Sequence, residues 1–223
     1  MEINIQEKIL RANDDMACKN RKYFTEKKVF VLNMMSSPGS GKTETLCKTL
    51  KKITPEIKTG VITGDICTTN DADRLKKTGV AAIQINTDQF GGDCHLAAHL
   101  IEKAAQNLNL KNLDLLIIEN IGNLVCPAEF DIGEDAKAVV LSVTEGEDKP
   151  LKYPLMFQEA DIAILNKIDL LPYLDFDLKE AVKNIKQVHP KIPVFEISAK
   201  TEQGFEPWIK WLKTSVKSKL MVL

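Results

Sequence analysis

The chain alternates between two kinds of segment. Short runs rich in Val, Ile and Leu, bounded by Gly, Asp and Asn, are typical of buried strands, whereas longer stretches repeat apolar residues with the period of an amphipathic helix. The expected strands are residues 29–32, 58–65, 81–86, 113–122, 138–143, 161–165 and 194–200. Because helical stretches separate most of these runs, we expect an α/β fold: a three-layer sandwich whose mostly parallel central sheet is covered on both faces.

A helical stretch also precedes the first strand. Within residues 4–24, Ile5, Ile9, Ala12 and Met16 lie at helical spacing among polar and basic residues, which predicts an amphipathic helix. We therefore divide the chain into an N-terminal helical extension, residues 1–26, and one α/β domain, residues 27–223. The helix is expected to pack on the sheet or on a partner subunit, and we assign it no chemistry.

The segment after the first strand is typical of a phosphate-binding loop, or P-loop. Residues 36–43, Ser-Ser-Pro-Gly-Ser-Gly-Lys-Thr, join an apolar strand to a helix. Backbone N–H groups and the helix dipole at such a junction attract phosphate, while the Lys reaches the outer phosphates and the Thr hydroxyl ligates Mg²⁺. The nucleotide contacts predicted here are Pro38, Gly39, Ser40, Gly41, Lys42, Thr43 and Thr45.

Two carboxylates lie where predicted strands end. Asp65 follows one apolar run and Glu119 another, and Gly122 comes shortly after Glu119. An acid at the carboxyl edge of a parallel sheet orients Mg²⁺ or its water, and a glycine N–H beside it can sense a γ-phosphate. We expect Lys42, Thr43, Asp65 and Glu119 to form the catalytic group, the last three around Mg²⁺. No strong base or arginine finger stands out, so slow hydrolysis is expected.

Two further motifs distinguish guanine from adenine. In Asn166-Lys167-Ile168-Asp169, the Asp169 carboxylate can accept hydrogen bonds from the guanine N1–H and amine, a donor pair that adenine lacks. The Lys167 stem can cover the base, and Asn166 can brace a neighbouring loop. Ser198-Ala199-Lys200 would add a backbone N–H for the guanine carbonyl oxygen. The sequence therefore predicts GTP rather than ATP.

Cysteine and histidine occur near two of these strand ends. Cys94 and His95 are adjacent, and Cys126 follows the Glu119–Gly122 segment. Thiolate and imidazole suit Zn²⁺ or Ni²⁺, whereas Mg²⁺ prefers oxygen. The spacing alone is a weak signal, because buried cysteines often serve only packing. Their position beside the nucleotide favours a metal site, and a second copy across a two-fold axis would bring four thiolates together.

Composition narrows the class of protein. The chain has 223 residues and a net charge of −1, which gives no reason to expect nucleic acid or an anionic membrane as partner. No apolar run approaches membrane-spanning length, and the first residues lack the order of a signal peptide. Five scattered cysteines argue against a disulfide framework. We expect a cytoplasmic protein.

Taken together, these motifs make the sequence closely similar to the HypB family of hydrogenase nickel-incorporation GTPases. The matching segments are residues 36–43, 70–74, 84–87, 94–96, 119–128 and 146–154. The resemblance implies a SIMIBI-class G domain with the P-loop NTPase fold, and a metallochaperone that hydrolyses GTP slowly and forms a homodimer with GTP bound. It also implies that Cys94, His95 and Cys126 bind Zn²⁺ or Ni²⁺ at the dimer interface. The implied partners are another nickel metallochaperone and the large subunit of [NiFe]-hydrogenase.

Two other functions stay open at this point. The urease accessory GTPases share the nucleotide motifs, but their metal motif resembles Cys-Pro-His, whereas Ala128 follows Cys126-Pro127 here. A nucleotide-gated interaction switch with packing cysteines would need no metal. Some HypB members carry an early Cys-rich or His-rich nickel motif, yet the first helical segment offers only Cys18. Residues 88–93 also differ from the short Gly-rich run expected before Cys-His.

Overall fold

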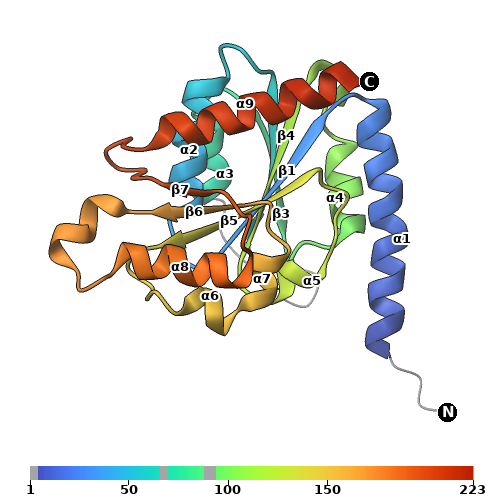
Figure 1. The fold of residues 1–223 in the computed structure, drawn as a ribbon. Helices are drawn as coiled ribbons and strands as arrows, with labels where there is room; N and C mark the ends of the chain where they lie inside the picture. The colour runs from blue at the N-terminus through green and yellow to red at the C-terminus, as the bar shows by residue number, and fades with distance from the viewer. Residues whose placement is uncertain (1–4, 66–69, 88–93, 223) are drawn as a thin grey trace.

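A computed structural model of the chain describes residues 5–65, 70–87 and 94–222, drawn in Figure 1. The strands are β1 Phe30–Ser36, β2 Thr59–Asp65, β3 Ala81–Asn86, β4 Leu115–Gly122, β5 Ala136–Ser142, β6 Ile162–Asn166 and β7 Val194–Glu196. They form one sheet in the order β3-β2-β4-β1-β5-β6-β7. Every neighbouring pair is parallel, so the carboxyl ends of all these strands meet at one edge of the sheet.

Helices cover both faces of this sheet. They are α1 Ile5–Glu26, α2 Lys42–Ile53, α3 Asn70–Lys76, α4 Ala98–Ala105, α5 Cys126–Glu129, α6 Lys149–Lys152, α7 Pro154–Gln158, α8 Leu178–Val188 and α9 Phe205–Val222. Apolar residues of α2, α3 and α9 share one core with the sheet. Residues of α1 and α4 form a second core, and those of α5, α7 and α8 a third, both on the opposite face. The predicted α/β three-layer sandwich is confirmed.

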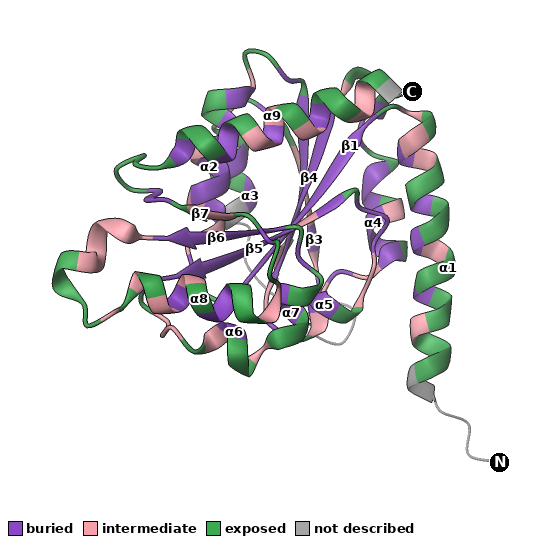
Figure 2. Ribbon diagram, in the orientation of Figure 1, coloured by how far each residue is buried: buried purple, intermediate pink, exposed green. Residues whose placement is uncertain are grey.

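Strand β1 shows how the sequence produces these layers. Leu32 and Met34 pack in the core under α2 and α9, whereas Val31 and Met35 point to the other face. Successive side chains of a strand point to opposite faces, so a strand covered on both sides is mostly apolar rather than alternating. Figure 2 shows the result, with the central strands buried and the outer faces of the helices exposed.

Helix α1 is fixed to the face of the sheet that α4 covers, by polar contacts as well as apolar ones. Asn13 donates to the Asp131 carbonyl at 2.7 Å and accepts from the Ala98 N–H at 2.9 Å. Asn20 donates to the carbonyls of Ala98 and Ile132, at 2.8 and 3.1 Å. The predicted amphipathic helix therefore lies against α4 and the segment before β5. In the part of the chain that the structure describes, no helix is long and apolar enough to span a membrane.

Two element ends differ from those predicted. Leu96, Leu100 and Ile101 repeat at helical spacing, yet the helix begins only at Ala98, so Leu96 precedes it. Leu96 instead packs its side chain against Gly64 of β2, within 2.8 Å of where a Cβ would stand. The last strand ends at Glu196, because the chain then turns, with the Glu202 N–H donating to the Ser198 carbonyl at 2.8 Å.

Candidate functional site

The P-loop occupies the junction between the end of β1 and the start of α2. Gly39 and Gly41 have φ of +76° and +88°, values in the left-handed region that favours glycine. A Cβ on Gly41 would also lie 2.5 Å from the side-chain nitrogen of Asn166. The loop therefore needs glycine at position 41 for its conformation and for its contact with the end of β6.

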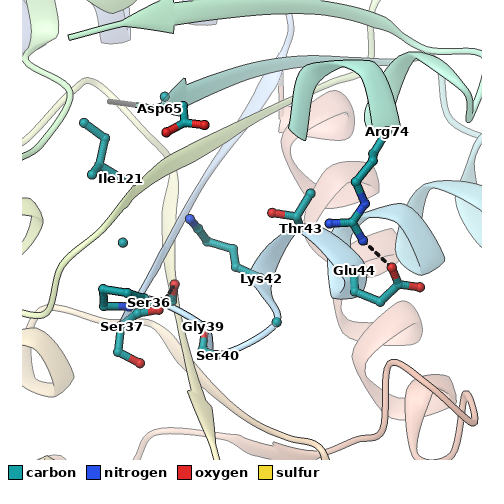
Figure 3. Close-up of a pocket in the computed structure, with 14 residues that line it drawn as sticks. Ser36, Ser37, Gly39, Ser40, Lys42, Thr43, Glu44, Asp65, Arg74 and Ile121 are labelled. Carbon is teal, nitrogen blue, oxygen red and sulfur yellow. Dashed lines mark hydrogen bonds and ion pairs between the residues drawn. The ribbon is translucent and has the colours of Figure 1, made fainter. Parts of the chain in front are cut away.

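A cavity of about 420 Å³ opens above this loop. Figure 3 shows Lys42 extending from the start of α2 into the space between the loop and Asp65. The lining residues are 36–44, Gly64, Asp65, Arg74, Ile121 and Gly122. Among the described residues, the hydroxyls of Ser40 and Thr45 are buried without a hydrogen-bond partner. Unsatisfied hydroxyls beside a lysine and a helix N-terminus fit a phosphate-bearing ligand.

The predicted Mg²⁺ ligands meet at one side of this cavity. Thr43 donates its hydroxyl to Glu119 at 2.5 Å, and Lys42 Nζ lies 3.7 Å from the same carboxylate. Thr63, which sequence reasoning missed, donates to the other Glu119 oxygen at 3.1 Å. Asp65 lines the same cavity. Hydroxyl and carboxylate oxygens are the donors that Mg²⁺ prefers, so this set fits the ion.

Gly122 lines the cavity where β4 approaches the P-loop. A Cβ on Gly122 would lie 3.1 Å from the Cα of Pro38, so only a small residue allows β4 and the loop to approach this closely. Strand β4 continues through Glu119 to Gly122 rather than ending at the acid. The end of β4, with Ile121 and Gly122, therefore lines the cavity beside the P-loop.

The predicted guanine motifs come together around the P-loop. Asn166, which is buried, donates to the Ser40 carbonyl at 2.9 Å and accepts from the Ala199 N–H at 3.0 Å. Lys167 donates to the Gly39 carbonyl at 2.7 Å. Asp169 accepts from the Ser198 hydroxyl at 2.5 Å. Asn166 thus braces the P-loop against the Ser198–Lys200 turn, as predicted.

Within the Ser198–Lys200 turn, the backbone donors have different roles. The Ala199 N–H is already held by Asn166, while the backbone N–H of Lys200 has no hydrogen-bond partner among the described residues. Lys200 therefore carries the available N–H of this tripeptide.

Arg74 and Glu44 form an ion pair at the rim of the cavity. Neither was predicted from the sequence, because no P-loop or guanine motif includes them. Arg74 does end the segment 70–74 that resembles the HypB family, and it lies in the helix after β2, but neither signal assigned it a role. Ser37 was also missed; its hydroxyl donates to Glu145, which accepts the Ser142 N–H at 2.9 Å as well.

The three predicted soft ligands form one cluster, and Cys126 begins the helix that follows the cavity-lining end of β4. The ligand atoms of Cys94, His95 and Cys126 lie within 4.8 Å of one another, and all three residues are half-buried. The two Sγ atoms are 2.6 Å apart. The His95 ring stacks on Phe130, with ring centroids 3.7 Å apart. Two thiols and an imidazole at this separation fit Zn²⁺ or Ni²⁺ and leave a coordination position for a further ligand.

The Cys126 thiol holds its proton at neutral pH. Burial and the adjacent Cys94 sulfur together raise its pKa to about 11, against the opposing effect of a hydrogen bond from Asn123. Only a thiolate coordinates a metal, so binding must displace protons. The predicted loop geometry at residues 88–93 lies outside the described residues.

Comparison with known proteins assigns the chain to a family. Residues 30–196 match the family model CobW/HypB/UreG, nucleotide-binding domain. The hydrogenase maturation factor HypB of Rhizobium leguminosarum bv. viciae is 50% identical over 213 residues, which cover 96% of this chain and 70% of that protein. The chain belongs to the HypB family.

Solved structures agree with this assignment. The crystal structure of HypB from Helicobacter pylori in complex with nickel superposes with a TM-score of 0.87 at 39% identity, covering 94% of this chain and 97% of that one. The signal recognition particle 54 kDa protein from Aeropyrum pernix, in complex with GDP, has a TM-score of 0.58 at 15% identity, covering 87% and 49%. At that identity only the fold is shared, and it is the fold of the SIMIBI-class P-loop proteins predicted from the sequence.

Proposed function

We propose that the protein is a GTP-hydrolysing metallochaperone that helps insert nickel into [NiFe]-hydrogenase in the reducing cytoplasm. The observation that carries the proposal is the cluster of Cys94, His95 and Cys126. Its Cys126 begins α5, which follows β4, and the end of β4 lines the nucleotide cavity. A plain interaction switch would not need two thiols and an imidazole that converge past the end of this strand.

Nucleotide binding is divided between the two motif groups. Residues 38–43 and Thr45 hold the phosphates, and Gly122 contacts the terminal one through its N–H. Asn166, Lys167 and Asp169, with the Ser198–Lys200 turn, select guanine, because a carboxylate accepts from both the N1–H and the amine of that base. The buried contacts of Asn166 with Ser40 and Ala199 support this division, since they fix the base and phosphate subsites relative to each other.

Hydrolysis relies on positioning and charge neutralisation. Thr43, Asp65 and Glu119 would hold Mg²⁺, which would offset the negative charge that develops on the outer phosphates. Lys42 would bind the β- and γ-phosphates. No general base for the attacking water was found in the sequence, and Arg74 at the rim is paired with Glu44, so we expect slow turnover.

The metal site is completed by a second copy of the chain. Cys94, His95 and Cys126 supply three ligands and are partly exposed, so a two-fold axis beside them would place two such sets face to face. GTP would favour this homodimer. The metal carried is nickel, with Zn²⁺ as the competing ion, and the recipients are a partner nickel metallochaperone and the hydrogenase large subunit.

Nucleotide and metal are coupled through the end of β4. Loss of the γ-phosphate would release the segment after Glu119, move Cys126 and change the metal site. The Asn123 side chain supports this link, since it donates to Cys126 Sγ at 3.3 Å and accepts from the Val125 N–H at 2.8 Å.

The test is a Ni²⁺ and Zn²⁺ titration of the whole protein, with and without a non-hydrolysable GTP analogue. We expect near-stoichiometric binding by the wild type, a change of affinity with the analogue, and loss of tight binding in Cys94→Ala and Cys126→Ala. Cys18→Ala is the matched control, because Cys18 is an exposed free cysteine on α1. A wild type that binds neither ion in either state would contradict the metallochaperone function and favour the plain interaction switch.

A further inference from the structure

Asn120 is a buried residue of β4 to which the nucleotide chemistry assigns no role. It lies between Glu119 and Ile121, and its side chain is 1% exposed. Its main-chain carbonyl accepts from Lys42 Nζ at 2.5 Å. Its side-chain oxygen accepts from the Leu96 N–H at 3.1 Å and from the Ile121 N–H at 2.9 Å. One residue thus contacts both the phosphate-binding lysine and the chain immediately after Cys94 and His95.

We infer that Asn120 is a positioning residue that links the phosphate state of Lys42 to the Cys94–His95 half of the metal site. The inference rests on the proposed function and extends it. In that function, the segment after Glu119 couples the nucleotide to Cys126 only, whereas Asn120 would couple it to Cys94 and His95.

Lys42 supplies the movable end of the link. Its ammonium group donates to the Asn120 carbonyl and lies 3.7 Å from Glu119. A P-loop lysine binds the β- and γ-phosphates, so GTP must draw Lys42 away from the Asn120 carbonyl. The Asn120 peptide group then loses its charged donor, and its orientation, which aims the side chain at Leu96, changes with it.

The segment around Leu96 can move when Asn120 changes orientation, because separate contacts hold it on two sides. Asn120 holds the Leu96 N–H from the nucleotide side. On the other side, Asn13 and Asn20 of α1 hold the N–H and carbonyl of Ala98. Leu96 itself is fully buried against Gly64. Contacts on the α1 side are remote from Lys42, so loss of the Asn120 bond would rotate the segment about Ala98 and carry His95 with it.

Hydrogen exchange of the metal-free protein tests the link directly. Backbone amides are compared between the nucleotide-free state and the state with the GTP analogue and Mg²⁺. We expect the Leu96 amide to exchange about 10-fold faster or more with the analogue, as the loss of its acceptor requires. The Ala98 amide, held by Asn13, is the internal control and should stay unchanged. Equal exchange of Leu96 in both states would overturn the inference.

Metal titration of variants provides the second test. Coupling is the ratio of Ni²⁺ dissociation constants without and with the GTP analogue. Asn120→Ala should bring this ratio close to 1 while GTP still binds, and Asn120→Ser, which is too short to reach Leu96, should do the same if the Ala variant does not fold. Asn184→Ala is the matched control: Asn184 is also a buried asparagine, but it lies on α8 and donates to the Glu147 carbonyl at 3.0 Å, so coupling should remain.

The outcomes separate the two proposals. A wild type without metal binding contradicts the proposed function. If the wild type shows coupling, and Asn120→Ala and Asn120→Ser both retain it, only the role of Asn120 is contradicted.

Discussion

At the residue scale, the most specific prediction concerns the effect of Asp169 on GTP affinity. Its carboxylate is fixed by the Ser198 hydroxyl at 2.5 Å, which leaves its remaining acceptor capacity for the guanine N1–H and amine. Asp169→Asn removes the charge and replaces one acceptor with a donor, and hydrogen bonds to charged groups contribute about 1.5–3 kcal/mol. We expect GTP affinity to fall by about 10- to 100-fold, measured with a fluorescent GTP analogue.

Selectivity is the decisive readout for Asp169. Affinity for ATP should stay at its wild-type level, so the GTP-over-ATP preference should shrink. Asp175→Asn, at an exposed position of the same loop region, is the control. An unchanged preference in Asp169→Asn would refute the guanine assignment.

Glu134 gives a prediction about pH. Burial raises its pKa to about 6 from an ordinary value of 4.5, and the negative charge of Asp131 adds to this against the opposing charge of Lys137. Between these two values, the folded protein holds a proton that the unfolded chain has lost. Stability from this group is therefore present below pH 4.5 and falls as pH rises to about 6, by at most about 2 kcal/mol.

Glu134→Gln isolates this effect. Gln resembles the protonated acid, so the variant should gain about 1–2 kcal/mol relative to wild type between pH 4 and pH 7. Urea unfolding at several pH values measures the difference. A difference that does not vary with pH would contradict the role assigned to Glu134.

At the element scale, α1 has a structural role that its pattern only partly indicated. Helical spacing of apolar residues predicted the helix, but it could not show that Asn13 and Asn20 hold Ala98 and residues 131–132. Side-chain amides at exposed and buried helix positions look alike in a sequence. Gly133 is part of the same contact, since a Cβ there would lie 2.6 Å from Asn20 Cβ.

Truncating Asn20 measures this contact. Asn20→Ala removes two buried hydrogen bonds, to the carbonyls of Ala98 and Ile132, and a buried carbonyl left without a donor costs about 1–3 kcal/mol. We expect a loss of about 2–4 kcal/mol in the free energy of unfolding, measured by urea denaturation. Lys19→Ala, at the neighbouring exposed position, should change stability by less than about 0.5 kcal/mol. Equal effects of the two substitutions would show that α1 is not held through Asn20.

The start of α4 shows where helical periodicity misleads. Leu96, Leu100 and Ile101 fit one helical face, and all three are buried. Leu96 is buried for a different reason, because it packs on Gly64 from an irregular segment before α4. That tertiary contact depends on a glycine far away in the sequence. It is also what leaves the Leu96 N–H available to Asn120.

At the scale of the whole molecule, the parallel order of strands made much of the site predictable. Motifs at the ends of β1, β2, β4 and β6 must meet at one edge of the sheet once the strands are parallel, whatever their exact pairing. Sequence could not supply contacts between elements to which no motif assigns a role, such as Thr63 with Glu119 or Asn120 with Leu96. These depend on register and side-chain direction.

The surface around the metal cluster leads to a prediction about assembly. Val125, Leu151 and Leu155 are exposed large apolar residues, 48, 43 and 40% accessible, and α5 contacts α7. Val125 adjoins Cys126, so apolar surface continues from the metal ligands. Burying such surface in a homodimer is worth roughly 25 cal/mol per Å². We expect sedimentation velocity to show dimers of the wild type with the GTP analogue and Ni²⁺.

Leu155→Ser should weaken this dimer by about 10-fold or more in dissociation constant, since a fully buried Leu contributes about 1.5–3 kcal/mol. Met221→Ser is the control, because Met221 is 83% exposed on α9, which covers the opposite face of the sheet. Cys126→Ala should weaken the dimer only when metal is present, because it removes a ligand but little apolar surface. If Leu155→Ser and Met221→Ser dimerise alike, the interface does not lie beside the metal cluster, and the ligands missing from Cys94, His95 and Cys126 must come from another partner.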